Sequence, residues 1–129
     1  MMDSMSVLQG SLIILGLLQI KHFLTDFVWQ TDRMIQEKGT YGARHGIYHS
    51  GLHALGTLVI FTMLDPVLGF ISALIDFIAH YHIDWAKIKI NENNHYTPKD
   101  KEFWFWFGLD QLSHQITYLF LVGWVFFVF

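Results

Sequence analysis

The segment DFIAHYHIDWAK, residues 76–87, ends a long apolar run and yet carries three ionisable side chains spaced four residues apart. Asp76, His80 and Asp84 therefore share one face of a helix, because residues at i, i+4 and i+8 lie above one another. Ionisable groups in an apolar helix are costly and usually face other helices or a wet cavity. The question for the rest of the chain is what this stripe contacts.

The composition of the whole chain indicates an integral membrane protein. It has 129 residues, of which 53% are hydrophobic, 17% aromatic and only 15% charged, and its mean hydropathy is +0.35. These values are too apolar for an ordinary soluble domain, and the length suits one domain. A net charge of −3 without a basic stripe argues against nucleic-acid binding. Because there is no cysteine, disulfides and thiolate metal sites are excluded.

Four apolar segments divide the chain, each close to the ~20 residues that a membrane-spanning helix needs. Asp65 and Pro66 interrupt the chain between the second and third segments, because proline cannot continue a helix interior. We therefore predict an all-α fold, a four-transmembrane-helix antiparallel bundle, as a single integral membrane domain over residues 1–129. The expected helices cover residues 5–29, 46–64, 67–87 and 98–129.

The basic residues predict how this bundle lies in the membrane. Apart from Lys21, they fall in the connection between the first two segments and at the connection between the last two: Arg33, Lys38, Arg44, Lys87, Lys89, Lys99 and Lys101. By the positive-inside rule both connections are cytoplasmic, so both termini of a multi-pass inner-membrane protein face outward. No basic residue precedes the first apolar core, so we expect a retained span rather than a cleaved signal peptide.

Every predicted span carries at least one pair of His and/or Asp residues four positions apart. The pairs lie at the C-terminal ends of the first and third spans and at the N-terminal ends of the others. An up-down bundle brings them together, roughly 5–15 Å below the cytoplasmic surface. Carboxylates gathered there repel one another unless they are protonated or bridged by cations. We therefore predict a divalent metal site formed by His22, Asp26, His49, His53, His80, Asp84, Asp110 and His114.

Eight candidate ligands exceed what one tetrahedral ion uses, so two ions fit the count better. Imidazole and carboxylate suit zinc, manganese and iron(II), and of these we expect zinc. Gln30 and Gln111 are expected to orient the ligands by hydrogen bonds, with helix–helix hydrogen bonding as the plainer alternative. His45 has three candidate roles: it orients the ligands, it is a third ligand from its helix, or it is a side chain at the membrane interface.

Two further residues are candidate catalytic groups. Asp76, the deepest of its stripe, is a candidate general base if it does not bind metal. For Lys87 we weigh two roles equally: stabilising negative charge in a transition state, and anchoring its helix at the membrane surface. For Lys21 we favour the anchoring role.

Four motifs resemble the pattern of a family of small bacterial and phage integral membrane proteins of unknown function. They are KHFLTDFVWQTD, HSGLH, HYHIDWAK and LDQLSH, at residues 21–32, 49–53, 80–87 and 109–114. The chain is more distantly similar to the YdjM-like membrane-bound metal-dependent hydrolases. The resemblance covers essentially the whole chain and implies a metal-dependent membrane enzyme. By motif position it picks out His22, Asp26, Gln30, His49, His80, Asp84, Lys87, Asp110, Gln111 and His114.

The preferred function is a membrane-embedded metal-dependent hydrolase near the cytoplasmic leaflet, because a bound metal lowers the pKa of its water toward ~7. A lipid-linked or small phosphorylated substrate suits that depth. The alternative is a non-enzymatic membrane protein with a structural metal site or a regulatory role. A metal or proton transporter ranks lower because the outer halves of the spans hold few polar groups, and a di-iron oxygenase because HxxHH clusters are missing. Besides the lipid bilayer, a second copy of this small chain is a candidate partner.

Overall fold

The computed structural model describes residues 4–128, and the regular structure within that range is entirely helical. The long helices are α1 (Ser4–Phe23), α3 (Arg44–Thr62), α4 (Pro66–Asn93) and α5 (Lys101–Phe127). A π-helical turn, η1 (Leu24–Val28), continues α1, and the short helix α2 (Asp32–Glu37) precedes α3. The prediction of an all-α chain is confirmed.

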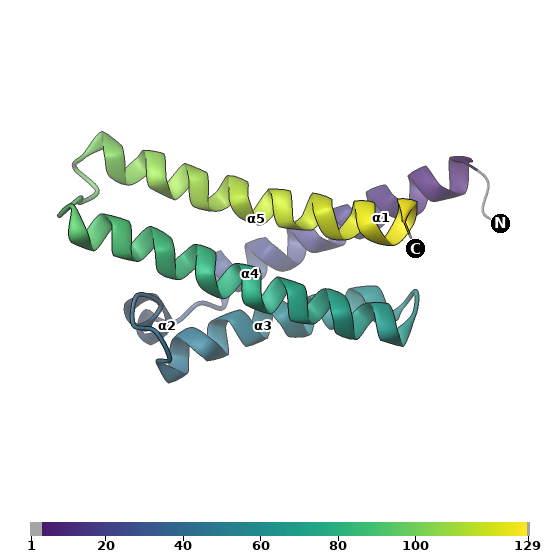
Figure 1. The fold of residues 1–129 in the computed structure, drawn as a ribbon, viewed down its shortest axis with the longest axis horizontal. Helices are drawn as coiled ribbons and strands as arrows, with labels where there is room; N and C mark the ends of the chain where they lie inside the picture. Colours follow the sequence, from purple (N-terminus) through teal and green to yellow (C-terminus); the bar gives the residue numbers. More distant parts are fainter. Residues whose placement is uncertain (1–3, 129) are drawn as a thin grey trace.

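The four long helices pack side by side, and each runs opposite to the two helices beside it (Figure 1). Helix α3 lies against α1 and α4, and α5 lies against the same two helices. The start of α1, the α3–α4 turn and the end of α5 lie at one end of the molecule, and α2 lies at the other (Figure 1). This order places the C-terminal halves of α1 and α4 beside the N-terminal halves of α3 and α5.

The turn between α3 and α4 lies where Asp65 and Pro66 predict it. The Asp65 carboxylate accepts hydrogen bonds from the backbone N–H groups of Val67 at 2.8 Å and Leu68 at 3.1 Å. Pro66 takes the first helical position, where no N–H is needed. Local cap chemistry therefore fixes this turn.

The other helix ends differ from the expected ranges. Helix α4 continues past Lys87 to Asn93, and α5 begins at Lys101 instead of residue 98. The later start follows from a turn in which the Asp100 carboxylate accepts hydrogen bonds from the backbone N–H and hydroxyl of Thr97. Residues 1–3 and Phe129, which the expected domain also included, lie outside the described residues.

Polar side chains fill one half of the interior, while apolar side chains cover the outside. His49, His53 and Thr57 on α3 are fully buried, whereas Val59 on the same helix is 60% exposed. Two segments, Ser6–Val28 and Pro66–Asn93, are long and apolar enough to cross a membrane. A polar interior under an apolar surface is the reverse of the arrangement in a water-soluble helical domain.

The half of the bundle nearest the α3–α4 turn has an apolar core. Leu18 of α1, Phe61 of α3, and Tyr118 and Leu121 of α5 are fully buried there in one cluster. The buried histidines and aspartates therefore gather in the opposite half, toward α2.

Helix α2 was not among the predicted elements. The Thr31 hydroxyl oxygen caps it by accepting a hydrogen bond from the Met34 backbone N–H at 3.3 Å. Gly39 then passes so close to α4 that a Cβ atom there would overlap the Ile88 side chain. These contacts hold the intervening Lys38 inside the bundle, where it is only 8% exposed.

Gly39→Ala is expected to destabilise the protein by about 1–3 kcal/mol, because the added methyl group pushes the segment carrying Lys38 away from α4. Gly51→Ala is the matched control. Among the described residues, no neighbouring atom lies within 4 Å of a Cβ at that position, and alanine favours helix. Unfolding in detergent, followed by circular dichroism, measures both variants. Equal stability of the two would contradict this packing.

Candidate metal centre

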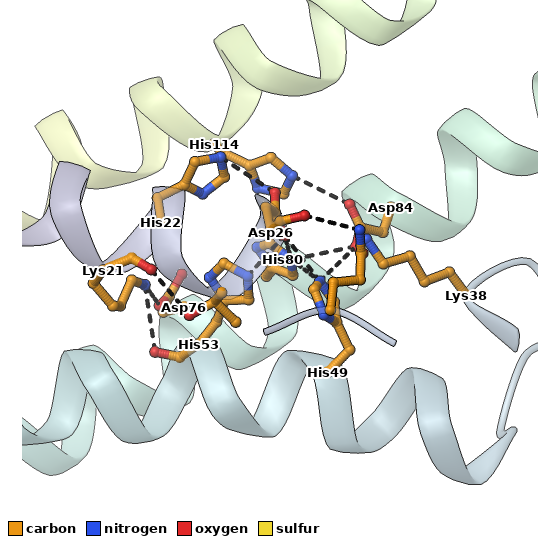
Figure 2. A network of polar contacts seen from close by, with 12 residues as sticks. Lys21, His22, Asp26, Lys38, His49, His53, Asp76, His80, Asp84 and His114 are labelled. Carbon is orange, nitrogen blue, oxygen red and sulfur yellow. Dashed lines mark hydrogen bonds and ion pairs between the residues drawn. The ribbon is translucent and has the colours of Figure 1, made fainter. Parts of the chain in front are cut away.

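The predicted stripes meet in the half of the bundle nearest α2 (Figure 2). Asp26 comes from η1, His49 and His53 from α3, and His80 from α4. These four side chains are buried, and each offers a ligand atom within 4.8 Å of the others. We call Asp26, His49, His53 and His80 the first group.

In the first group, three imidazole nitrogens surround one carboxylate oxygen. Asp26 Oδ1 lies 2.9 Å from His53 Nε2, 3.0 Å from His49 Nε2 and 3.7 Å from His80 Nε2. The Nε2 atoms of His49 and His80 are 3.1 Å apart. A tetrahedral ion with bonds of ~2.0–2.1 Å separates its ligand atoms by ~3.3–3.4 Å. The observed spacings bracket that value, so the group fits one divalent ion.

Within the described chain, the histidines of the first group use only one of their two ring nitrogens, Nε2, for polar contacts. The Nδ1 atoms of His49, His53 and His80 are buried and have no hydrogen-bond partner within residues 4–128. Metal-binding histidines usually donate their other ring N–H to an acceptor, so these Nδ1 atoms differ from the usual ligand arrangement. Here the polar contacts of all three rings converge on one place, as they do in a ligand set.

The π-helical turn η1 positions Asp26. The Trp29 backbone N–H donates to the Leu24 carbonyl oxygen at 2.8 Å, which is the i→i+5 pattern. The Gln30 amide Nε2 donates to the backbone carbonyl of Asp26 at 2.8 Å. Gln30 therefore contacts the backbone of a predicted ligand rather than a ligand side chain. Such turns inside helices are frequent at functional sites.

A second group consists of His80, Asp84 and His114, which are also buried and converge within 4.8 Å. Asp84 Oδ1 lies 3.2 Å from His114 Nε2, and Asp84 Oδ2 lies 3.2 Å from His80 Nε2. His80 belongs to both groups, but one Nε2 atom can bind only one ion. Asp84 Oδ2 is also 3.4 Å from His49 Nε2. The Asp84 carboxylate is therefore the side chain that can link two ions.

Two predicted ligands, His22 and Asp110, lie beside these groups. His22 Nε2 is 3.2 Å from Asp26 Oδ2 and 3.0 Å from Gln111 Oε1, and His22 Nδ1 is 2.9 Å from the Tyr118 hydroxyl. Gln111 Nε2 donates to Asp110 Oδ2 at 3.0 Å. Both ring nitrogens of His22 are thus engaged by neighbours. Through these contacts His22 can orient the Asp26 carboxylate, and Gln111 can orient that of Asp110.

Three buried carboxylates pair with lysines, a feature that sequence reasoning missed. The pairs are Lys21 with Asp76 at 2.7 Å, Lys38 with Asp84 at 2.9 Å and Lys87 with Asp110 at 3.4 Å. The ion pairs found for Asp26 within the described chain are with histidines. A metal ion in the first group would therefore balance the negative charge of Asp26, which has no lysine partner among the described residues.

Asp76 lies outside both groups, on the side away from Lys38 (Figure 2). Its Oδ2 accepts hydrogen bonds from Lys21 Nζ at 2.7 Å and from the Thr57 hydroxyl at 2.6 Å. Lys21 Nζ also donates to the His53 carbonyl oxygen at 3.3 Å. Lys21 is only 7% exposed, so it is not the surface anchor that we expected. The network favours a structural ion pair over a general base.

His45 lies at the corner between α2 and α3 and contacts Glu37. The His45 backbone N–H donates to Glu37 Oε2 at 2.7 Å, and its ring Nδ1 is 2.8 Å from Glu37 Oε1. The backbone hydrogen bond first, and then the ring contact, lower the pKa of the Glu37 carboxyl from its ordinary value of 4.5. His45 therefore helps to hold the segment that carries Lys38.

The acid stability of this corner is expected to depend on Glu37. A carboxyl whose pKa is lowered by folding contributes stability above its unfolded pKa and loses it as the pH falls through its folded pKa. The stability difference between wild type and Glu37→Gln should be constant from neutral pH to about 4.5 and should shrink at lower pH. A pH series of thermal unfolding curves measures this difference, and a difference that grows on acidification would contradict it.

A cavity of about 740 Å³ lies at the α2 end of the bundle, between α2, α4 and α5. Its wall includes Lys38 and Lys87, whose ammonium groups also contact the buried carboxylates of Asp84 and Asp110. A molecule in this cavity would meet the same lysines that border the second group. The cavity therefore adjoins the buried centre through Lys38 and Lys87.

Most of the chain matches one protein family. The model of a family described as protein of unknown function (DUF3307) matches residues 14–128. The chain belongs to this family. The match contains every residue of both groups, and it confirms the resemblance to a family of unknown function. No comparison shows the similarity to the YdjM-like hydrolases. No curated protein and no solved structure matches the chain.

Proposed function

We propose that this protein is a four-span membrane hydrolase that binds a divalent metal in the first group. The observation that carries the proposal is the convergence of three buried histidine Nε2 atoms on Asp26 Oδ1, at 2.9–3.7 Å. Zinc is the preferred ion for such a set of nitrogen and oxygen ligands. A second ion at the second group, linked through Asp84, accounts for the remaining ligands.

The outer surface supports four spans. Helices α3 and α5 are not among the two described segments that are apolar enough to cross a membrane, and both carry buried polar side chains. On their outer faces, Leu55 and Val59 of α3 and Ile116 and Phe120 of α5 are all more than half exposed. An apolar surface of this kind suits lipid. By the positive-inside rule, the basic residues near α2 and at the α4–α5 connection support a cytoplasmic position for that end of the bundle.

The cavity favours catalysis over a purely structural metal. A bound ion supplies hydroxide at neutral pH by lowering the pKa of its water. Lys38 and Lys87 line the cavity and can stabilise negative charge on a substrate. Asp110 is better placed than Asp76 as a general base, since its Oδ1 is buried, lies 3.5 Å from His114 Nε2 and makes no hydrogen bond within residues 4–128.

The apolar half of the bundle weighs against transport. Leu18, Phe61 and Leu121 are fully buried between the polar groups and the end of the bundle at the α3–α4 turn. An ion or proton path would need polar groups or water along that half. A reaction at the α2 end needs no such path.

The proposed activity is tested with purified protein in detergent and a panel of phosphoester and carboxylester substrates. We expect turnover that stops on chelation, returns when zinc, manganese or iron(II) is added, and falls at least about 100-fold in Asp26→Asn. His82→Gln is the control, because His82 contacts Tyr41 and the Ile78 carbonyl oxygen and not the two groups. Turnover that persists in metal-free protein would contradict the proposal. Metal binding without turnover would favour a structural metal.

A further inference from the structure

We propose that the 740 Å³ cavity binds a phosphate ester with neighbouring hydroxyl groups, carried on an apolar chain. Taking this ligand to be the substrate rests on the proposed hydrolase function. Binding of the ligand does not depend on that function, because it follows from the charge, the polar atoms and the apolar surface of the cavity wall.

The charged side chains of the cavity wall favour an anionic ligand. Lys38, directly after α2, and Lys87 of α4 reach the cavity, and each ammonium group has three donors. Each lysine makes one ion pair with a carboxylate, so donors remain for a ligand. Glu92, which also lines the cavity, is itself paired with Lys89 at 2.7 Å. A phosphate held by two lysines is a common arrangement, because lysine binds phosphate as a point charge.

Two amide side chains in the described wall of the cavity have unpartnered carbonyl oxygens, which favour a ligand with hydroxyl groups. Asn91 is 9% exposed and lines the cavity, and its Oδ1 is buried with no hydrogen-bond partner among the described residues. Gln30 also lines the cavity, and its Oε1 is likewise buried without a hydrogen-bond partner in that part of the chain. An amide can accept from a hydroxyl group or donate to one, so a polyol next to the phosphate would satisfy both side chains.

The rest of the wall indicates an amphiphile rather than a fully soluble metabolite. Phe103 and Phe107 of α5, Ile88 of α4 and Ile35 of α2 line the cavity. Lys87 Nζ lies 5.6 Å above the centre of the Phe107 ring, so the charged and apolar surfaces are adjacent. In a four-span orientation the cavity lies at the membrane surface, where a glycerophospholipid presents a phosphate and hydroxyl groups beside apolar chains.

The test is calorimetric titration of the protein in uncharged detergent with three probes. They are short-chain phosphatidylglycerol, glycerol 3-phosphate, and phosphatidylcholine of the same chain length. We expect phosphatidylglycerol to bind and phosphatidylcholine, which lacks hydroxyl groups and net charge, to bind at least about tenfold more weakly. Glycerol 3-phosphate binding as tightly as the lipid would assign the site to a soluble phosphate. Equal binding of both lipids, or binding of none of the probes, would overturn the proposal.

Matched lysine variants locate the binding. Lys38→Gln and Lys87→Gln are expected to weaken phosphatidylglycerol binding at least about tenfold, through loss of a charge-assisted hydrogen bond. Lys101→Gln should leave it unchanged, because Lys101, at the start of α5, does not line the cavity and, unlike Lys89, is not paired with Glu92. Unchanged binding in both cavity variants would refute the site.

Two measurements keep the result independent of variant folding and of the metal. In the wild type, phosphatidylglycerol should protect Lys87, but not Lys101, from a small amine-modifying reagent, as read by mass spectrometry. Absence of this protection would also refute the site. Metal content is measured in the same samples. Lipid binding by protein that takes up no metal would support the lipid site and refute the metal site. Turnover of other substrates without lipid binding would support the metal site and refute the lipid site.

Discussion

Asp26→Asn protein is expected to bind zinc at least about 100-fold more weakly than the wild type. Changing a group that merely supports a ligand already costs 10–100-fold in affinity, so removing a central ligand should cost at least the upper value. Asp26 Oδ1 is the oxygen around which His49, His53 and His80 converge. Asparagine keeps the shape of the side chain but removes the negative charge that balances the ion.

The zinc affinity of Asp26→Asn is measured by competition with a chromogenic chelator in detergent. His82→Gln is the control, since it removes an imidazole from the helix that carries His80 but leaves both groups intact. Its affinity should equal that of the wild type. An Asp26→Asn protein with wild-type affinity would exclude the first group as the metal site.

Lys21→Met is expected to destabilise the protein by about 3–5 kcal/mol, because it leaves the Asp76 carboxylate buried without its charged partner. Lys21 and Asp76 are 7% and 1% exposed, so water cannot replace the lost ion pair. Methionine keeps the length and much of the apolar volume of the lysine side chain. The change therefore tests the charge and not the packing.

A double-variant cycle separates the ion pair from other effects of the substitution. Lys21→Met combined with Asp76→Asn should cost much less than the sum of the single changes, because no unpaired charge remains. Reversible unfolding in detergent gives the free energy of unfolding for each protein. Additive effects, or a cost below about 1 kcal/mol for Lys21→Met, would show that the pair does not hold α1 to α4.

The all-α fold and the place where the His and Asp stripes meet could be predicted because both depend on local periodicity. Asp76, His80 and Asp84 had to share a face once the segment was helical, and Asp65–Pro66 had to interrupt the chain. Helix directions in an up-down bundle then determined which ends meet. No information about packing was needed for either step.

The lysines could not be predicted in the same way, because their positions depend on contacts between distant segments. Lys38 enters the bundle because Gly39 passes tightly against Ile88, 49 positions further along the chain. The signal that would have revealed α2 is local: Thr31 followed by Asp32 is a helix start, and glycine ends the segment. The π-helical turn at Asp26 has no comparable signal in the sequence.

The separation of the candidate ligands into those within and those beside the two groups also depends on packing. His22 and Asp26 have the spacing of a ligand pair, but the Tyr118 and Gln111 side chains engage both ring nitrogens of His22. Tyr118 comes from the far half of α5, and its position relative to α1 is set by how the two helices pack. Spacing along one helix cannot reveal such a partner.

The metal content of the wild-type protein tests the central claim most directly. The protein is purified in detergent without added metal, and its metals are quantified by inductively coupled plasma mass spectrometry before and after incubation with zinc, manganese or iron(II) and gel filtration. The account predicts at least one equivalent of a divalent metal retained by folded protein. Folded protein that contains no metal and takes up none would contradict it, and would leave the buried histidines and aspartates as hydrogen-bonded contacts between helices.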